Sequence, residues 1–113
     1  MSGILIKEQK DFDRIIRTGK SANTSVGRIK FRINAINKPK MGIIIGKKQG
    51  LNSVQRNRIR RIFKEAWRQI VHDISTPIEF VVFPYKQNYG LKTAKIREVL
   101  VGFINVNIIG QNR

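Results

Sequence analysis

Apolar residues recur at helical spacing in three stretches of the chain. In the first stretch Phe12, Ile15 and Ile16 fall on one side of a helix, and Gly19 supplies a helix stop. The other two stretches also repeat apolar residues every three or four positions. Helices are therefore predicted over residues 7–19, 53 to about 72, and 91 to about 104.

Two kinds of strand pattern lie between these helices. From Arg28 to Ile36 apolar and polar residues alternate, which predicts a half-buried strand with a basic outer face. Residues 41–46 are continuously apolar, as is typical of an inner strand covered on both sides, and the largely apolar run 78–83 predicts a second inner strand. Because a long helix separates these two runs, we expect a parallel pair, and the usual rule favours a right-handed crossover. One α/β domain is predicted over residues 1–113, with an ordered core at about 7–104.

The charge of the chain points to a polyanionic partner. The 113 residues include 23 Lys and Arg against 7 Asp and Glu, which gives a formal net charge of +16. Because 41% of the residues are hydrophobic, we expect a folded protein that binds a polyanion rather than a disordered basic tail. A membrane is not expected as that polyanion, since no apolar run reaches the roughly 18 residues of a spanning helix. With no cysteine and no export signal, the chain is expected in the cytoplasm.

The long central helix separates apolar from basic residues. Ile59, Ile62, Phe63, Ala66 and Ile70 form the apolar stripe, and an adjoining face carries Arg56, Arg60, Arg61, Lys64 and Arg68. The planar fork of arginine suits phosphate oxygens. A merely solvated face is the alternative interpretation. One acid on this helix, Glu65, cannot balance so many cations, and Lys47 with Lys48 extend the basic patch, so a partner is predicted.

The sequence does not suggest catalysis by the protein itself. His72 is the only histidine and the acids are scattered, so neither a histidine pair nor a carboxylate cluster for metal ions is predicted. Charge alone leaves several binding functions open. A ribosomal protein or an RNA chaperone would fit equally well. An architectural DNA-binding protein would also use the basic helix, but it would predict a dimer with paired half-sites.

One segment resembles a known family. The sequence GIIIGKKQG at residues 42–50 is followed by VQRNRIRRIFKEAWR at residues 54–68. A strand that ends in two lysines and a glycine, followed by Arg-Asn-Arg and a basic helix, resembles the signature of the bacterial ribonuclease P protein. The resemblance extends more weakly over about residues 7–103. The stretch between Gly50 and Arg56 is one residue longer than the usual pattern, and Ile16 stands where the family often has a second aromatic.

The resemblance implies both a fold and a function. The fold would be an α/β (α+β) two-layer sandwich of order αβββαβα, with a left-handed crossover joining the parallel strands. The chain would be the protein subunit of ribonuclease P, an endoribonuclease that removes the 5′ leader from precursor tRNA. The catalytic centre and its magnesium would lie in the RNA subunit, so no metal or cofactor is expected on this protein's side chains alone. The expected partners are that RNA and the leader, not DNA or a membrane.

The resemblance also implies roles for particular residues. Those expected to contact the RNA subunit are Lys47, Lys48, Arg56, Asn57, Arg58, Arg60, Arg61, Lys64 and Arg68. Phe12 matches an aromatic that lines the leader cleft, and Lys30 or Phe31 is expected across the groove, because single strands stack on aromatics beside cations. An ordinary core position is the alternative for both aromatics, and it is favoured for Phe31.

Overall fold

A computed structural model describes residues 4–33, 38–46, 50–85 and 90–107. The expected order αβββαβα is confirmed. The elements are α1 (Gln9–Thr18), β1 (Lys20–Asn23), β2 (Gly27–Ile33), β3 (Lys40–Ile43), α2 (Ser53–Ile70), a 3-10 turn (Val71–Asp73), β4 (Ile78–Pro84) and α3 (Thr93–Asn107).

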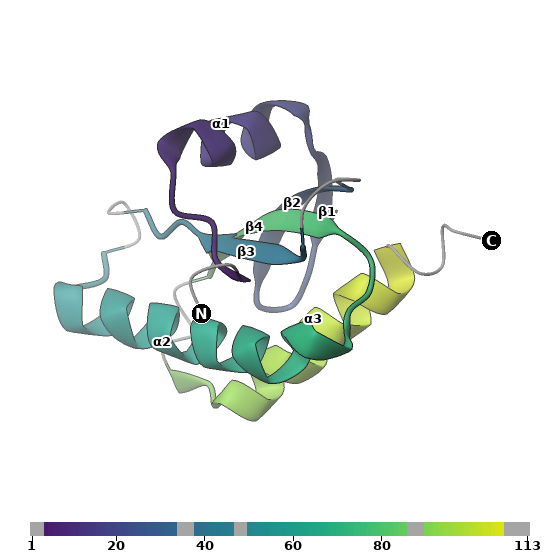
Figure 1. Cartoon of the computed structure of the whole chain (residues 1–113). Coiled ribbons are helices and arrows are strands. Elements are labelled where there is room, and N and C mark those ends of the chain that lie inside the picture. The colour runs from purple at the N-terminus through teal and green to yellow at the C-terminus, as the bar shows by residue number, and fades with distance from the viewer. Residues whose placement is uncertain (1–3, 34–37, 47–49, 86–89, 108–113) are drawn as a thin grey trace.

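The strands form one mixed sheet of order β1-β2-β4-β3. β2 runs antiparallel to both β1 and β4, whereas β3 and β4 are parallel and are joined through α2. The parallel pair predicted from the two apolar runs is thus confirmed, while the hand of its crossover stays a prediction. α2 and α3 cover one face of the sheet and α1 lies over the other (Figure 1). None of the helices in the described ranges is both long and apolar enough to cross a membrane.

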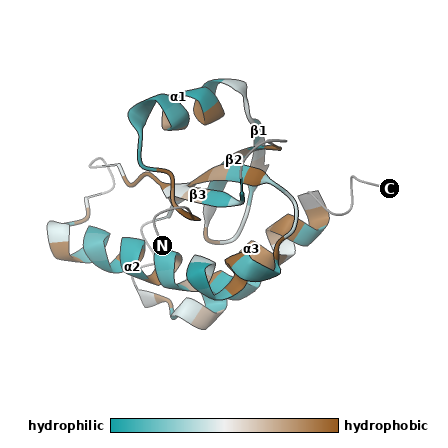
Figure 2. Cartoon of the chain, in the orientation of Figure 1, coloured by the Kyte–Doolittle hydropathy of each residue, from teal (hydrophilic) through white to brown (hydrophobic). Residues whose placement is uncertain are grey.

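The main core lies between the sheet and the pair α2 and α3. Alternate residues of β4 reach it, and the Phe80 ring meets Trp67 edge-on with a centroid distance of 5.1 Å. Phe31 of β2 meets Phe103 of α3 in the same way at 5.3 Å. The predicted apolar stripe of α2 is buried here, and its basic residues remain on the hydrophilic face that Figure 2 shows along the helix.

A smaller core lies beneath α1. Ile6, Ile15 and Val81 are buried in it, with Phe12 partly buried at its margin. Glu79 is the one carboxylate among the described residues that is buried, and Arg14 of α1 contacts it with an N–O distance of 3.0 Å. Because an unpaired buried carboxylate is costly, this ion pair ties α1 to the centre of the sheet.

β3 differs from the prediction. It lies at the edge of the sheet, not inside it, and its strand geometry ends at Ile43 although the apolar run continues to Gly46. The run is apolar because both faces are covered and the N-terminal segment Ile4–Ile6 protects the outer edge. The amide of Ile6 donates to the Met41 carbonyl over 2.9 Å, so packing begins before the expected start at residue 7.

Other element ends also shift. β1 was not predicted from the residue pattern. The predicted strand at 28–36 corresponds to β2 and is described only to Ile33. The long helix ends at Ile70 and gives way to the 3-10 turn, and the last helix begins at Thr93 and continues to Asn107. Such ends depend on capping and fraying, which periodicity does not report.

A reciprocal cap fixes the start of α2. The Asn52 side chain accepts from the Gln55 amide over 2.8 Å, and the Gln55 side chain accepts from the Asn52 amide over 3.0 Å. Two backbone amides that the helix cannot satisfy are thereby bonded. The residues that lengthen this loop therefore include the cap of the basic helix.

Replacing the cap should destabilise the fold. We expect Asn52→Ala to lower the free energy of unfolding by about 1 kcal/mol. Asn57→Ala, the same change inside the helix, should leave it unchanged or raise it, because alanine is the better helix former. Urea unfolding followed by circular dichroism measures both. Equal effects of the two variants would show that the cap contributes nothing specific.

Candidate nucleic-acid interface

α2 carries most of the residues predicted to bind RNA. Asn57, Arg58, Arg61, Lys64 and Arg68 are exposed, and Arg56 and Arg60 are half-buried. All seven belong to one rigid helix whose apolar stripe is fixed in the core, so their relative positions are set by the helix. Lys47 and Lys48 lie outside the described residues.

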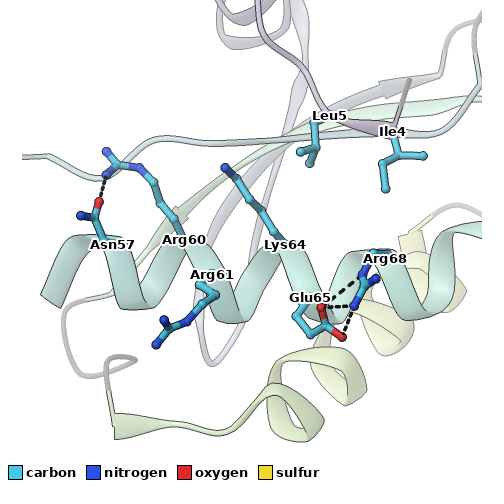
Figure 3. A pocket seen from close by; sticks show the side chains of 8 residues that line it. All are labelled: Ile4, Leu5, Asn57, Arg60, Arg61, Lys64, Glu65 and Arg68. Carbon is cyan, nitrogen blue, oxygen red and sulfur yellow. Dashed lines mark hydrogen bonds and ion pairs between the residues drawn. The ribbon is translucent and has the colours of Figure 1, made fainter. Parts of the chain in front are cut away.

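A groove runs between α2 and the N-terminal segment. This α2 groove has a volume of about 450 Å³ and is lined by Ile4, Leu5, Asn57, Arg60, Arg61, Lys64, Glu65 and Arg68. Figure 3 shows Arg60 and Lys64 extending from the helix on the side of Leu5, whereas Arg61 points away from that segment. One wall is therefore aliphatic and the other cationic.

The cations of the groove are not equally available. Two nitrogens of Arg68 contact the Glu65 carboxylate, with distances of 3.1 and 2.6 Å, and Gln69 also donates to it. The hydrogen bond from Arg68 lowers the pKa of Glu65, so this carboxylate stays ionised at neutral pH. Arg68 is thus partly neutralised, and Arg60 and Lys64 carry the accessible charge on the side of Leu5.

Arg56 has a structural task as well. Its guanidinium donates to the Leu51 carbonyl over 2.7 Å and lies 3.3 Å from the Ser53 hydroxyl. Within the described ranges, Arg60 makes one long side-chain hydrogen bond, 3.4 Å, to Asn57. Arg56 therefore braces the turn before α2, and Arg60 is the more available of the two for a ligand.

The face of the sheet beside α1 forms a second basic surface. Lys30 lies on this face directly across β4 from Gly42, since both pair with Val81. The Phe12 ring lies over Gly42, where an added Cβ would come within 2.5 Å of its Cε1 atom. Phe12 and Lys30 thus belong to the same side of the sheet, as predicted.

The position of Phe31 excludes its expected role in leader binding and confirms the favoured alternative, a core position. Phe31 is 4% exposed, and its ring packs on Phe103 in the main core, on the opposite side of the sheet from Phe12. Because successive residues of a strand point to opposite faces, Lys30 and Phe31 could not both have faced α1. Lys30 is therefore the residue placed across from Phe12, and the ring of Phe31 is not available for stacking.

Sequence reasoning missed two pairs of residues at these surfaces. Arg28 lies over the half-buried ring of Phe83, 5.5 Å from its centroid, on the α1 side of the sheet. The alternation around Lys30 could have indicated Arg28 as a site residue, but Phe83 was predicted only as part of the largely apolar run 78–83. Ile4 and Leu5 were missed because so short an apolar segment has no periodicity to interpret.

A second hollow connects the two surfaces. This Phe12 pocket, about 170 Å³, is lined by Leu5, Ile6, Lys7, Phe12, Met41, Gly42, Ile43, Arg60 and Lys64. It shares Leu5, Arg60 and Lys64 with the α2 groove. The basic face of α2 therefore continues past Leu5 to the aromatic of α1. No three metal-ligating His, Cys, Asp or Glu side chains gather anywhere in the described part of the chain.

The comparisons with known proteins agree in one family. The family model described as Ribonuclease P matches residues 4–105. A ribonuclease P protein component from Dictyoglomus turgidum is 32% identical over 98 residues, which cover 85% of this chain and 82% of that protein. One from Lactobacillus helveticus is 29% identical over 103 residues, with 85% and 80% covered.

Solved structures show the same fold. A Staphylococcus aureus RNase P protein, a mutant with defective mRNA degradation activity, aligns with a TM-score of 0.75 and 25% identity, covering 90% of this chain and 86% of that one. The RNase P protein from Thermotoga maritima aligns with a TM-score of 0.74 and 24% identity, covering 87% and 92%. With a family model spanning nearly the whole chain, and α2 carrying the Arg-Asn-Arg sequence on its exposed side, the chain belongs to the bacterial ribonuclease P protein component family.

Proposed function

We propose that this chain, a protein subunit of ribonuclease P, binds the catalytic RNA subunit through α2 and the 5′ leader of precursor tRNA through the sheet beside α1. The holoenzyme acts on tRNA precursors, which we expect it to meet in the cytoplasm. One observation carries the proposal: a family match over residues 4–105 coincides with a helix whose cations face solvent beside a single carboxylate. Phosphate contacts supply most of the affinity of such surfaces.

The protein's contribution is binding and positioning. This proposal assigns the magnesium ions and the cleavage of the phosphodiester to the RNA subunit, as the family resemblance implies. Arg60 and Lys64 reduce the repulsion between the two RNAs by placing positive charge between them. Holding the substrate in register then lowers the concentration of magnesium that the RNA needs.

The leader would lie along the sheet beside α1. The half-buried Phe12 ring lies over Gly42, and Lys30 and Arg28 supply cations on the same face. Single-stranded RNA binds such surfaces through stacking and backbone charge without strict sequence preference. This surface therefore suits leaders of varied sequence.

The proposal predicts stimulated cleavage. Bacterial ribonuclease P RNA should cleave a precursor tRNA at the mature 5′ end faster at low magnesium once this protein is added in equimolar amount. Single-turnover cleavage with and without the protein is the measurement. Tight binding of the RNA without faster cleavage would instead favour a ribosomal or chaperone role.

The α2 cations should set the salt dependence of RNA binding. Arg60→Ala and Lys64→Ala should each reduce the slope of log Kd against log salt for the RNA subunit by about one unit. Arg17→Ala, which removes an exposed charge from α1, serves as the control and should leave the slope nearly unchanged. Filter binding between 50 and 400 mM salt, about one decade, measures these slopes. Equal slopes for all three variants would exclude a specific role for α2.

A substitution at Glu65 should change RNA binding in the opposite direction from the substitutions at Arg60 and Lys64. Glu65→Gln keeps the shape of the side chain but releases Arg68, so RNA binding should become tighter and its slope steeper by about one unit. Weaker binding by this variant would mean that the ion pair orients Arg68 for its contact.

Phe12 should contribute to recognition of the leader. Phe12→Leu should reduce the preference of the holoenzyme for precursor over mature tRNA about fivefold or more, because a stacking partner is lost. Phe31→Leu, the same change in the main core, should lower stability but keep the preference. Titrations with both RNAs under non-cleaving conditions measure it. An unchanged preference in Phe12→Leu would assign Phe12 to packing alone.

A further inference from the structure

The N-terminal segment is a fixed wall, not a loose tail. The indole nitrogen of Trp67 donates to the Ile4 carbonyl over 2.8 Å, and Trp67 itself is 0% exposed. On the other side, the Ile6 amide bonds to β3 at Met41. The segment is therefore held from α2 and from the sheet at once, which leaves Ile4 and Leu5 beside the groove.

The α2 groove has the size and chemistry of a small-ligand site. Its volume of about 450 Å³ falls in the range of about 300–1,000 Å³ typical of such sites. Ile4 and Leu5 are half-buried and apolar, and Figure 3 shows them facing the helix that carries Lys64 and Arg60. A ligand that fills it needs a flat or apolar part next to anionic groups.

The charge of the lining favours an anion. Arg60, Arg61 and Lys64 line the groove, and its one carboxylate, Glu65, is engaged by Arg68. A nucleotide combines an apolar face with phosphates in the required way. Bases within a duplex are stacked and cannot enter a one-sided hollow, whereas unpaired bases can be splayed out of the RNA.

We propose that the α2 groove binds one unpaired nucleotide of an RNA, with its base against Ile4 and Leu5 and its flanking phosphates on Arg60 and Lys64. This inference rests on the proposed RNA-binding function and adds a subsite to it. Trp67 acts as a positioning residue, because its hydrogen bond holds the wall on which the base rests. The groove thereby distinguishes single-stranded from fully paired RNA.

The test compares a single strand with a duplex. The full-length protein is titrated with hexaadenylate and with a blunt RNA duplex of matched phosphate number, in wild type and Ile4→Asn. Ile4 lines the α2 groove and is not among the residues that line the Phe12 pocket, so the variant separates the two hollows. Val101→Asn, the same kind of change at an exposed position on α3, is the control. Thermal unfolding of each variant verifies the fold.

Binding of a base in the α2 groove predicts a selective loss of affinity for the single strand. Ile4→Asn should weaken hexaadenylate binding about fivefold, at the lower end of what one base contributes, and leave the duplex unchanged. Arg60→Ala should weaken the binding of both RNAs, whereas Val101→Asn should weaken the binding of neither. Ile4→Asn should cause the same loss of hexaadenylate affinity in a protein that also carries Phe12→Leu. That result would exclude the leader surface as the source of the loss.

Other results would overturn the inference in distinguishable ways. If Ile4→Asn binds both RNAs with the affinity of the wild type, the groove holds no base. The proposed binding of RNA by α2 would not be affected by that result. An equal loss for both RNAs would mean that the segment merely supports α2. If wild type binds neither RNA nor the ribonuclease P RNA subunit, the proposed function itself fails.

Discussion

The burial of Trp67 connects the interior of this protein to its charged surface. Its ring packs edge-on against Phe80 at the centre of the sheet, while its nitrogen holds the Ile4 carbonyl. A buried indole N–H needs a partner, and here the N-terminal segment supplies it. The same side chain therefore fixes the height of α2 above the sheet and the position of the segment beside it. Trp67 therefore fixes the backbone that carries the α2 cations relative to the N-terminal segment.

The opposite side of the sheet depends on a different contact. α1 has only a small apolar cluster beneath it, and Glu79 accepts from Arg14 and lies 3.6 Å from the nitrogen of Arg32. Two arginines directed inward at one buried carboxylate specify where α1 lies and how it is turned. A chain with so few acids thus uses one of them inside the fold, where it pairs with two arginines.

The sequence predicted the elements that apolar periodicity controls. The stripe of α2 and the central strand β4 are buried along their lengths, and so both were found close to their observed bounds. β1 was missed because Lys20–Asn23 is polar and joins the sheet only by pairing with β2. β3 was taken for an inner strand because segment 4–6, far away in sequence, covers its edge. The Arg-Asn-Arg helix was recognisable as a binding face, but the groove was not, since its second wall comes from that same segment.

The reciprocal cap at Asn52 and Gln55 has an electrical consequence. Both capping side chains are neutral, and the first turn of α2 contains no acid, although an anion there would stabilise the helix. The partial positive charge of the helix end, about half an elementary charge, is therefore not neutralised by a carboxylate and adds to Arg56 and Arg58. α2 is polarised along its axis, with its strongest potential at the end nearest Asn52. A polyanion arriving by diffusion experiences a torque as well as an attraction, so it is turned toward one end of the helix before any contact forms.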